Sequence, residues 1–217
     1  MNSDFVAGGV PEGMVPRTTE ARNAGEVVVV ATRRRQPSVA LWGMAMLLAS
    51  EATLFAAMIG SYYYLRFTTP AWPPPWDPEP KVVVPLILVA ALATTSVPMQ
   101  LAANAAKRGR LLATRLLIVW ALLVQCGYVG YEIHDYLHEL AGDPVQRDAY
   151  SSIYFTLLGA DHAHVLFGIL LSVWLLWKLA RGLTMYRLNA VQVIAFYWHL
   201  VNFLTLVVIG VLLSATF

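Results

Sequence analysis

Glu51 is the residue whose type and position carry the most chemical information in this sequence. It lies 13 residues into an apolar stretch that covers residues 38–67, about 20 Å along a helix from its start. That depth is close to the middle of a bilayer, where a charged side chain costs at least ~2.5–3.5 kcal/mol. We therefore expect Glu51 to be protonated or paired at neutral pH. Its role is either functional and proton-linked or a hydrogen bond that fixes the packing of two helices.

Two histidines in later apolar stretches are the candidate partners of Glu51. His164 and His199 lie at roughly comparable depth, and Asn202 follows His199 by three residues on the same helical face. A histidine beside a buried acid favours an ion pair or a shared proton, whereas a packing histidine satisfies a backbone carbonyl. Histidines on two facing helices are also a pattern of haem ligation. Trp198 leaves little room for a macrocycle beside His199, so we expect no redox cofactor on this chain.

A second group of polar residues lies toward the outer ends of the third and fourth apolar stretches. Glu132, Asp161 and His162 form a possible outer cluster. His134 and His138 share one helical face and are a weak candidate for a metal pair, but a clear third ligand is missing. Such side chains at a helix end are usually solvated, so we expect no metal. The sequence also lacks a phosphate-binding glycine loop, a Cys-x-x-Cys pair and a nucleophile motif, and we expect no catalysis by this chain alone.

The elements that must position these residues are membrane-spanning helices. Of the 217 residues 58% are apolar and 13% are charged, about half the charge of a soluble domain. The net charge of +2 is too small to predict nucleic-acid binding. Each apolar stretch is long enough to cross the ~30 Å hydrocarbon core. The sequence thus predicts an all-α protein with five spans, near residues 38–67, 82–106, 111–131, 153–180 and 191–217.

Positive charge is concentrated at one end of the predicted spans. The opposite end has three basic residues and collects most of the acidic ones. The positive-inside rule therefore predicts a cytoplasmic N-terminus and an outside C-terminus. Residues 1–37 are expected to form a mostly disordered cytoplasmic tail, and residues 38–217 the membrane domain. The basic residues at the cytoplasmic end are Arg33, Arg34, Arg35, Lys107, Arg108, Arg110, Arg115, Lys178, Arg181 and Arg187.

The first outer loop, residues 68–80, is too rich in proline to be helical. Trp72 and Trp76 in this loop suit the lipid headgroup layer, and with Arg66 they are candidates for phospholipid contact. In the second span, Pro85 near the outer end and Pro98 nearer the inner end predict a curved helix, because an internal proline removes one backbone hydrogen bond.

Small residues recur every fourth position along the first span. This ridge lets another helix approach closely, and we expect that helix to belong to the same chain. The ridge consists of Ala45, Ala49, Thr53, Ala57 and Ser61.

Several motifs taken together resemble subunit III of the haem–copper oxidases, the cytochrome c oxidase type, in its short five-helix form. The resemblance covers residues 38–217. Three positions depart from the family's pattern: Asp161 stands for a histidine, His162 for a glycine and Asn202 for an aspartate. The matching segments are Ser50-Glu51, Tyr62-Tyr-Tyr-Leu-Arg66, Glu132, Tyr150-Ser-Ser-Ile-Tyr-Phe155, Gly159, His164-Val-Leu-Phe-Gly168 and Tyr197-Trp-His-Leu-Val201.

The resemblance implies an accessory subunit that carries no haem or copper itself and sits against catalytic subunit I, with subunit II in the same complex. It implies a bacterial plasma-membrane location and phospholipid held between two arms, spans one and two against spans three to five. It also implies that Glu51 is a carbodiimide-reactive carboxylate and that the subunit supports proton uptake and stability. Two alternatives stay open: a subunit-III-like companion of a nitric oxide reductase, and a stand-alone proton-conducting transporter.

Overall fold

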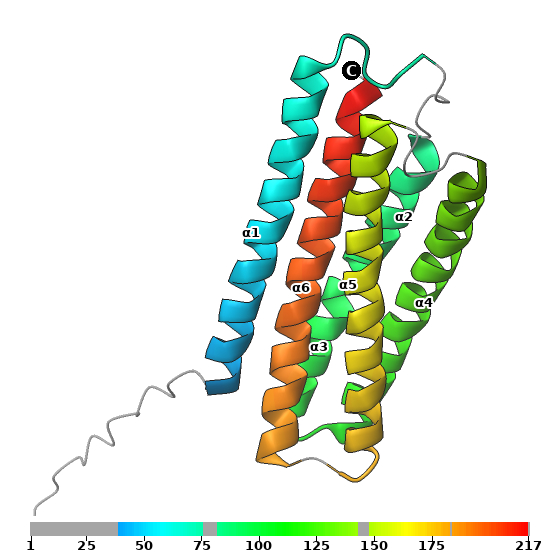
Figure 1. Cartoon of the computed structure of the whole chain (residues 1–217). Coiled ribbons are helices and arrows are strands. Elements are labelled where there is room, and N and C mark those ends of the chain that lie inside the picture. The colour runs from blue at the N-terminus through cyan, green and yellow to red at the C-terminus, as the bar shows by residue number, and fades with distance from the viewer. Residues whose placement is uncertain (1–38, 76–81, 143–147, 183, 217) are drawn as a thin grey trace, which may run out of the picture. The chain divides into compact units, whose positions relative to one another are not determined.

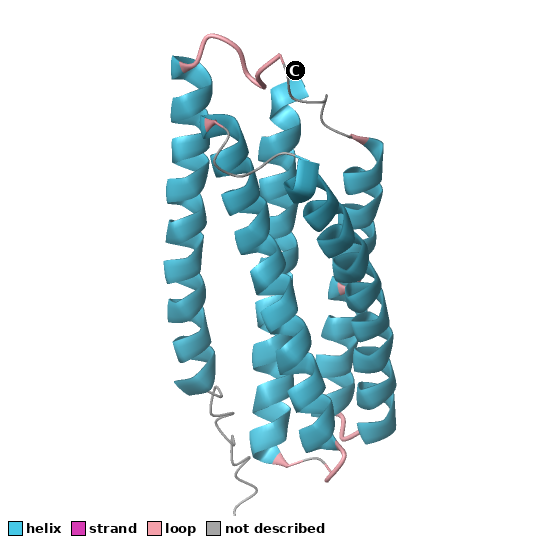
Figure 2. Ribbon diagram, turned by 45° about the vertical axis from the view of Figure 1, so that its right-hand side comes forward, coloured by secondary structure: helices cyan, strands magenta, loops and turns pink. Residues whose placement is uncertain are grey.

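The computed structural model of the protein describes residues 39–75, 82–142, 148–182 and 184–216. Within these ranges the chain is helical and has no strand (Figures 1 and 2). The predicted tail over residues 1–37 and the lipid-contact candidate Trp76 lie outside the described residues. The described helices are α1 (Val39–Thr68), α2 (Val83–Thr94), α3 (Ser96–Lys107), α4 (Leu111–Gly142), α5 (Ala149–Leu179) and α6 (Met185–Leu213), followed by a 3-10 turn over Ser214–Thr216.

The five predicted membrane spans are confirmed by length and composition. The span Val83–Lys107 consists of α2 and α3 together, and the other four spans each correspond to one long helix. Polar helical turns lengthen three of these helices. α4 continues past the end of its apolar stretch, and α5 and α6 begin before the start of theirs. At its start α5 is capped by the Asp148 side chain, which accepts a hydrogen bond from the Ser151 amide at 2.8 Å.

The second span is broken at Thr95, between α2 and α3. Pro98 lies three residues further on and has no amide hydrogen to donate to the carbonyl of Thr94. At the break, the Thr95 hydroxyl donates a hydrogen bond to the Leu92 carbonyl at 2.6 Å. This interruption lies near Pro98, in the span for which the sequence predicts curvature, and it leaves a polar hydroxyl at the break.

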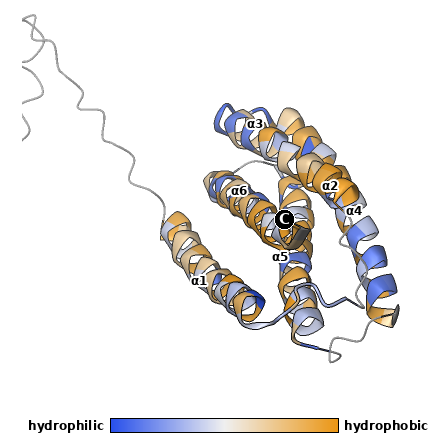
Figure 3. Ribbon diagram, turned by 90° about the horizontal axis from the view of Figure 1, so that it is seen from above, coloured by the Kyte–Doolittle hydropathy of each residue, from blue (hydrophilic) through white to orange (hydrophobic). Residues whose placement is uncertain are grey.

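α6 is the central helix of the bundle. It packs against α1, α2, α3 and α5, while α1 lies beside α5 and α6 only, among the described helices. The view along the bundle shows α1 on the flank of α6, with α2 and α3 on the far side (Figure 3). The prediction that spans one and two form one arm is therefore wrong among the described helices, because α1 contacts α5 and α6 and not α2. The phospholipid predicted between the two arms stays a prediction.

The burial of the two helices reflects this arrangement. Thirteen residues of α6 are buried, compared with three in α1. The fourteen residues between α1 and α2 can reach about 46 Å when extended, so they can lead past a helix 8–10 Å away.

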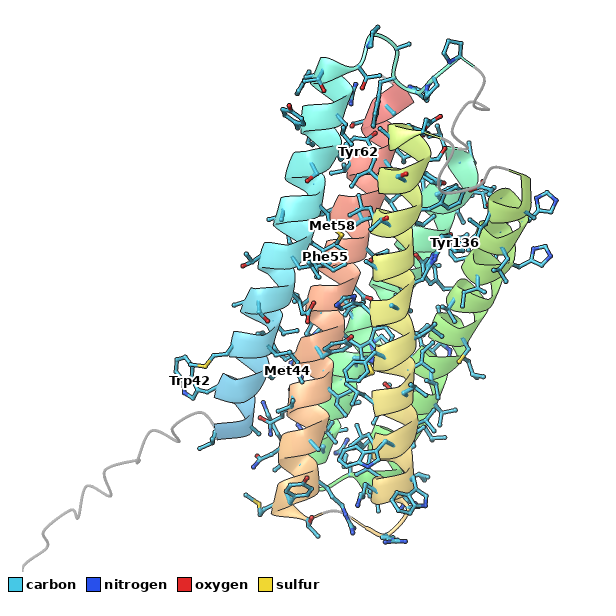
Figure 4. All side chains as sticks on the ribbon, viewed as in Figure 1. Trp42, Met44, Phe55, Met58, Tyr62 and Tyr136 are labelled. Carbon is cyan, nitrogen blue, oxygen red and sulfur yellow. The ribbon has the colours of Figure 1, made fainter. Side chains whose placement is uncertain are left out.

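α1 contacts the bundle along one stripe. Its buried residues Leu48, Phe55 and Tyr62 are spaced by seven positions. Figure 4 shows Phe55, Met58 and Tyr62 directed toward α5 and α6, and Trp42 directed away. The small-residue ridge from Ala45 to Ser61 is mostly exposed instead. The prediction that this ridge packs within the chain is wrong, because the larger side chains of the stripe bury more apolar surface against α6.

Candidate functional site

Glu51 and His164 form a polar contact between α1 and α5. The Glu51 Oε2 atom lies 3.1 Å from His164 Nε2. The side chains are 29% and 20% exposed, respectively, so the pair lies at the edge of the seam between the helices. The contact predicted for Glu51 is thus confirmed, with His164 as the partner.

The geometry around the imidazole limits how many hydrogens the pair can hold. His164 Nδ1 lies 2.7 Å from the backbone carbonyl of Ala160, which only accepts, so Nδ1 carries a hydrogen. If the ring is neutral, Nε2 accepts and the Glu51 carboxyl must donate. If the ring is charged, Nε2 donates to a carboxylate. In both arrangements one hydrogen lies between Oε2 and Nε2, so the contact is a one-proton site.

Neighbouring aromatic residues fix the position of His164. The Phe55 ring meets the imidazole edge-on, with centroids 5.1 Å apart. The Tyr197 hydroxyl donates to the His164 carbonyl at 2.8 Å, which ties α6 to α5 at this level. The site is therefore built from three helices: α1 supplies the acid, α5 the imidazole and α6 the support.

His199 and Asn202 belong to a different contact. His199 Nε2 lies 3.0 Å from Gln100 Oε1 on α3, and not beside Glu51. The Asn202 amide donates to the hydroxyls of Thr95 and Ser96 at 3.2 Å and 2.8 Å. These residues join α6 to the break in the second span.

The predicted outer cluster divides between two neighbouring helices. Glu132 Oε2 on α4 lies 3.3 Å from His162 Nε2 on α5, and both side chains are buried. Asp161 turns to α6, where its Oδ1 accepts from the Thr205 hydroxyl at 2.8 Å. Consecutive helical residues point about 100° apart, so Asp161 and His162 serve different neighbours.

The remaining candidates have partners or surroundings of other kinds. His134 and His138 are exposed, and the described residues contain no group of three His, Cys, Asp or Glu side chains suited to a metal. Arg66 donates to the Ser214 hydroxyl at 2.7 Å. The Trp72 ring packs edge-on against Tyr62 and Tyr150.

Sequence reasoning missed several polar residues of the membrane core. Thr95, Gln125, Tyr128 and Thr205 are buried, and Gln100 contacts His199. Gln100 and Gln125 are amides inside apolar stretches, a signal that was available from the sequence. Thr205 and Tyr128 carried no such signal, because both residue types are common in membrane helices.

Comparison with known proteins shows that the chain is similar to subunit 3 of several oxidases. No protein-family model matches it. It is similar to cytochrome c oxidase subunit 3 of Bacillus sp. strain PS3, with 29% identity over 74% of this chain and 78% of the relative. The quinol oxidase subunit 3 of Bacillus subtilis is 28% identical over 74% of this chain and 79% of its own length. Cytochrome c oxidase subunit 3 of Thermostichus vulcanus is 22% identical over 88% and 95%, respectively.

Proposed function

We infer the function of this chain from its family, because it belongs to the subunit 3 family of the cytochrome c and quinol oxidases. It acts as an accessory subunit of a terminal haem–copper oxidase in aerobic respiration. The observation that carries this proposal is the match to oxidase subunits over 78% to 95% of their length. The alternatives of a nitric oxide reductase companion and a stand-alone transporter are not favoured, because these relatives are named as subunits of cytochrome c or quinol oxidases.

The chain is a multi-pass bacterial membrane protein, and its partners are other subunits of the oxidase. In the proposal these are catalytic subunit I and subunit II, with phospholipid on the exposed apolar faces. The N-terminus lies in the cytoplasm. Support for this orientation comes from the connections between α3 and α4 and between α5 and α6, which share one end of the bundle (Figure 1). These connections and the helix turns beside them carry seven basic residues, which are Lys107, Arg108, Arg110, Arg115, Lys178, Arg181 and Arg187.

The haem and copper of the complex are assigned to the other subunits. Support comes from His164, because both of its ring nitrogens are engaged within the chain, one by Glu51 and the other by the Ala160 carbonyl. An axial ligand to haem needs a free imidazole nitrogen aimed at the iron.

Glu51 and His164 are the residues through which this subunit influences proton uptake by the complex. The pair holds one exchangeable proton and is partly exposed at the edge of α1 and α5. A group of another subunit that covers this edge can reach the pair without opening the bundle. The proposed effect is on how long and at what pH the oxidase sustains turnover, not on electron transfer itself.

The test is purification followed by activity measurement. The chain, tagged and extracted in mild detergent, should retain haem absorbance, copper and the other oxidase subunits by mass spectrometry. Oxygen consumption is then followed over time and pH with cytochrome c and with quinol as donors. Complexes that contain Glu51→Gln should start near the wild-type rate and lose activity faster, most clearly at high pH.

One control variant and two contrary outcomes separate the parts of this proposal. Ser50→Ala changes the exposed neighbour of Glu51, whose hydroxyl bonds its own helix, and should leave the time course unchanged. Recovery of the chain without haem or oxidase subunits would contradict the accessory role. Immediate and total loss of haem reduction on removal of the chain would show that it is a catalytic subunit.

A further inference from the structure

Four buried polar atoms in the core between α4, α5 and α6 have no hydrogen-bond partner among the described residues. They belong to side chains that are at most 4% exposed. Buried polar groups nearly always find a partner in folded proteins. Their concentration in one region therefore indicates that something else occupies it. The four atoms are Gln125 Oε1, Tyr128 OH, Asp161 Oδ2 and Asn202 Oδ1.

Hydrogen bonds connect these residues into one region. The amide nitrogens of Gln125 and Asn202 both approach the Thr95 hydroxyl, at 3.4 Å and 3.2 Å. One helical turn along α6 from Asn202, Thr205 donates to Asp161. Tyr128 lies one turn along α4 from Gln125 and within electrostatic range of Asp161. We call these four residues with orphaned atoms the polar core.

The chemistry of the orphaned atoms identifies the class of ligand. Two amide oxygens require hydrogen-bond donors, and the phenol requires an acceptor for its hydrogen. Water supplies both kinds of group and commonly fills buried polar sites of this type. A lipid chain supplies neither. A metal cation would suit the oxygens but would leave the phenol hydrogen unpaired.

Asp161 has no cationic partner in the described part of the chain. The two histidines that interact electrostatically with it contact other carboxyl groups, His162 with Glu132 and His164 with Glu51. A fully buried carboxylate without a cation is far less favourable than the neutral acid. The neutral acid also has a hydroxyl on Oδ2, which can donate to water. The titratable groups around Asp161 are Tyr128 and Glu132 on α4, His162 and His164 on α5, and Tyr197 on α6.

We propose that the polar core is a hydrated proton-binding site, in which Asp161 is a neutral carboxylic acid that exchanges its hydrogen with bound water. The carboxyl gives one hydrogen to water and takes one from it, so no charge accumulates. This site is separate from the Glu51 pair, because His164 turns its Nε2 toward Glu51 and not toward Asp161. The inference does not depend on the oxidase function.

Infrared spectroscopy of the full chain in detergent tests the state of Asp161. At neutral pH we expect a carboxylic-acid carbonyl band that shifts to lower frequency in D2O, persists in Glu51→Gln and disappears in Asp161→Asn. A folded Asp161→Asn variant that instead loses only carboxylate bands would overturn the proposal.

A second variant keeps the test decisive where Asp161→Asn does not fold. Thr205→Val removes the donor to Asp161 Oδ1 and nearly preserves side-chain shape. In a chain that also carries Glu51→Gln, Thr205→Val should shift the remaining carboxylic-acid band, because the Asp161 carbonyl loses its hydrogen bond. An unmoved band would contradict the assignment to Asp161.

Radiolytic hydroxyl labelling tests the bound water, and the chain offers a matched pair of tyrosines. Tyr128 and Tyr197 are 3% and 2% exposed, but the Tyr197 hydroxyl is used by the His164 carbonyl. Radicals formed from internal water should label Tyr128 several-fold more than Tyr197. Equal and low labelling would mean a dry core and would overturn the proposal.

Replacement of Na⁺ by choline should leave the acid band unchanged, and a changed band would identify a cation as the occupant.

Discussion

α1 and α6 are nearly equal in length, at 30 and 29 residues, and both are apolar enough to span a membrane. However, α6 is enclosed by other helices, whereas α1 lies at the edge of the bundle. Among the described helices, α6 has four helical neighbours and α1 has two. The comparison teaches that apolar composition predicts a span and does not predict its place in the bundle. The place of a helix in the bundle depends on how many of its faces can bury side chains against other helices.

The polar residues of the two helices differ accordingly. Glu51 on α1 meets one partner and remains partly exposed. Asn202 and Thr205 on α6 are enclosed by neighbouring helices. A polar residue at the edge of the bundle is open on one side to groups outside the chain. A polar residue enclosed by helices can bond only the groups that the fold brings to it.

Trp198→Ala should produce the largest loss of stability and test the central position of α6. Trp198 is fully buried, and its indole N–H donates to Ser172 at 2.9 Å. We expect a loss of about 3–5 kcal/mol in the free energy of unfolding, measured by detergent-denaturant titration. Trp42→Ala on α1, where the ring is 59% exposed, should change it by less than about 0.5 kcal/mol. Equal losses would mean that the two helices are equally enclosed.

Two glycines give a finer version of the same test. A Cβ at Gly168 on α5 would lie 2.8 Å from Trp198 Cζ2 and 2.9 Å from Tyr197 Cε1, whereas one at Gly60 on α1 would meet nothing within 4 Å. Gly168→Ala should destabilise by about 1–3 kcal/mol through overpacking. Gly60→Ala should stabilise by up to about 1 kcal/mol through lower helix entropy cost. Thermal unfolding of both variants checks the opposite signs.

A double-mutant cycle on Glu51 and His164 measures how strongly the peripheral helix is held by its polar contact. The cycle uses Glu51→Gln, His164→Gln and the double variant. We expect a coupling of about 0.6–1.7 kcal/mol, the range for polar contacts between membrane helices. The same cycle on His134 and His138, which are exposed on α4, serves as a control and should give no measurable coupling. A coupling near zero for Glu51 and His164 would mean that the contact does not hold α1.

Ala57→Leu should have the smallest effect. Ala57 lies on the exposed ridge of α1, so added methyl groups face none of the described helices. The free energy of unfolding of the isolated chain should change by less than about 0.5 kcal/mol. A loss above about 1 kcal/mol, the size of an overpacking effect, would restore the rejected idea that the ridge packs within the chain.

Much of the fold and part of the site were predictable from local information. The five spans, the break near Pro98 and the partnership of Glu51 with a histidine all depend on residues whose cost in lipid is known without a structure. The pairing of Glu132 with His162 was only a possible cluster, and the contact of Asp161 with Thr205 was missed. Those contacts depend on how helices rotate against each other, which helical periodicity alone does not specify.

The sequence by itself determined that this chain is a bundle of membrane helices with an acid that needs a partner at mid-depth, because hydrocarbon excludes unpaired charge. Only the tertiary structure decided which helix stands in the centre and which partner each polar group receives. It selected His164 over His199 for Glu51, separated α1 from α2, and gathered Gln125, Asp161 and Asn202 into one core. The physical reason is that these outcomes depend on total burial over all helix pairs, a sum that no single stretch of sequence contains.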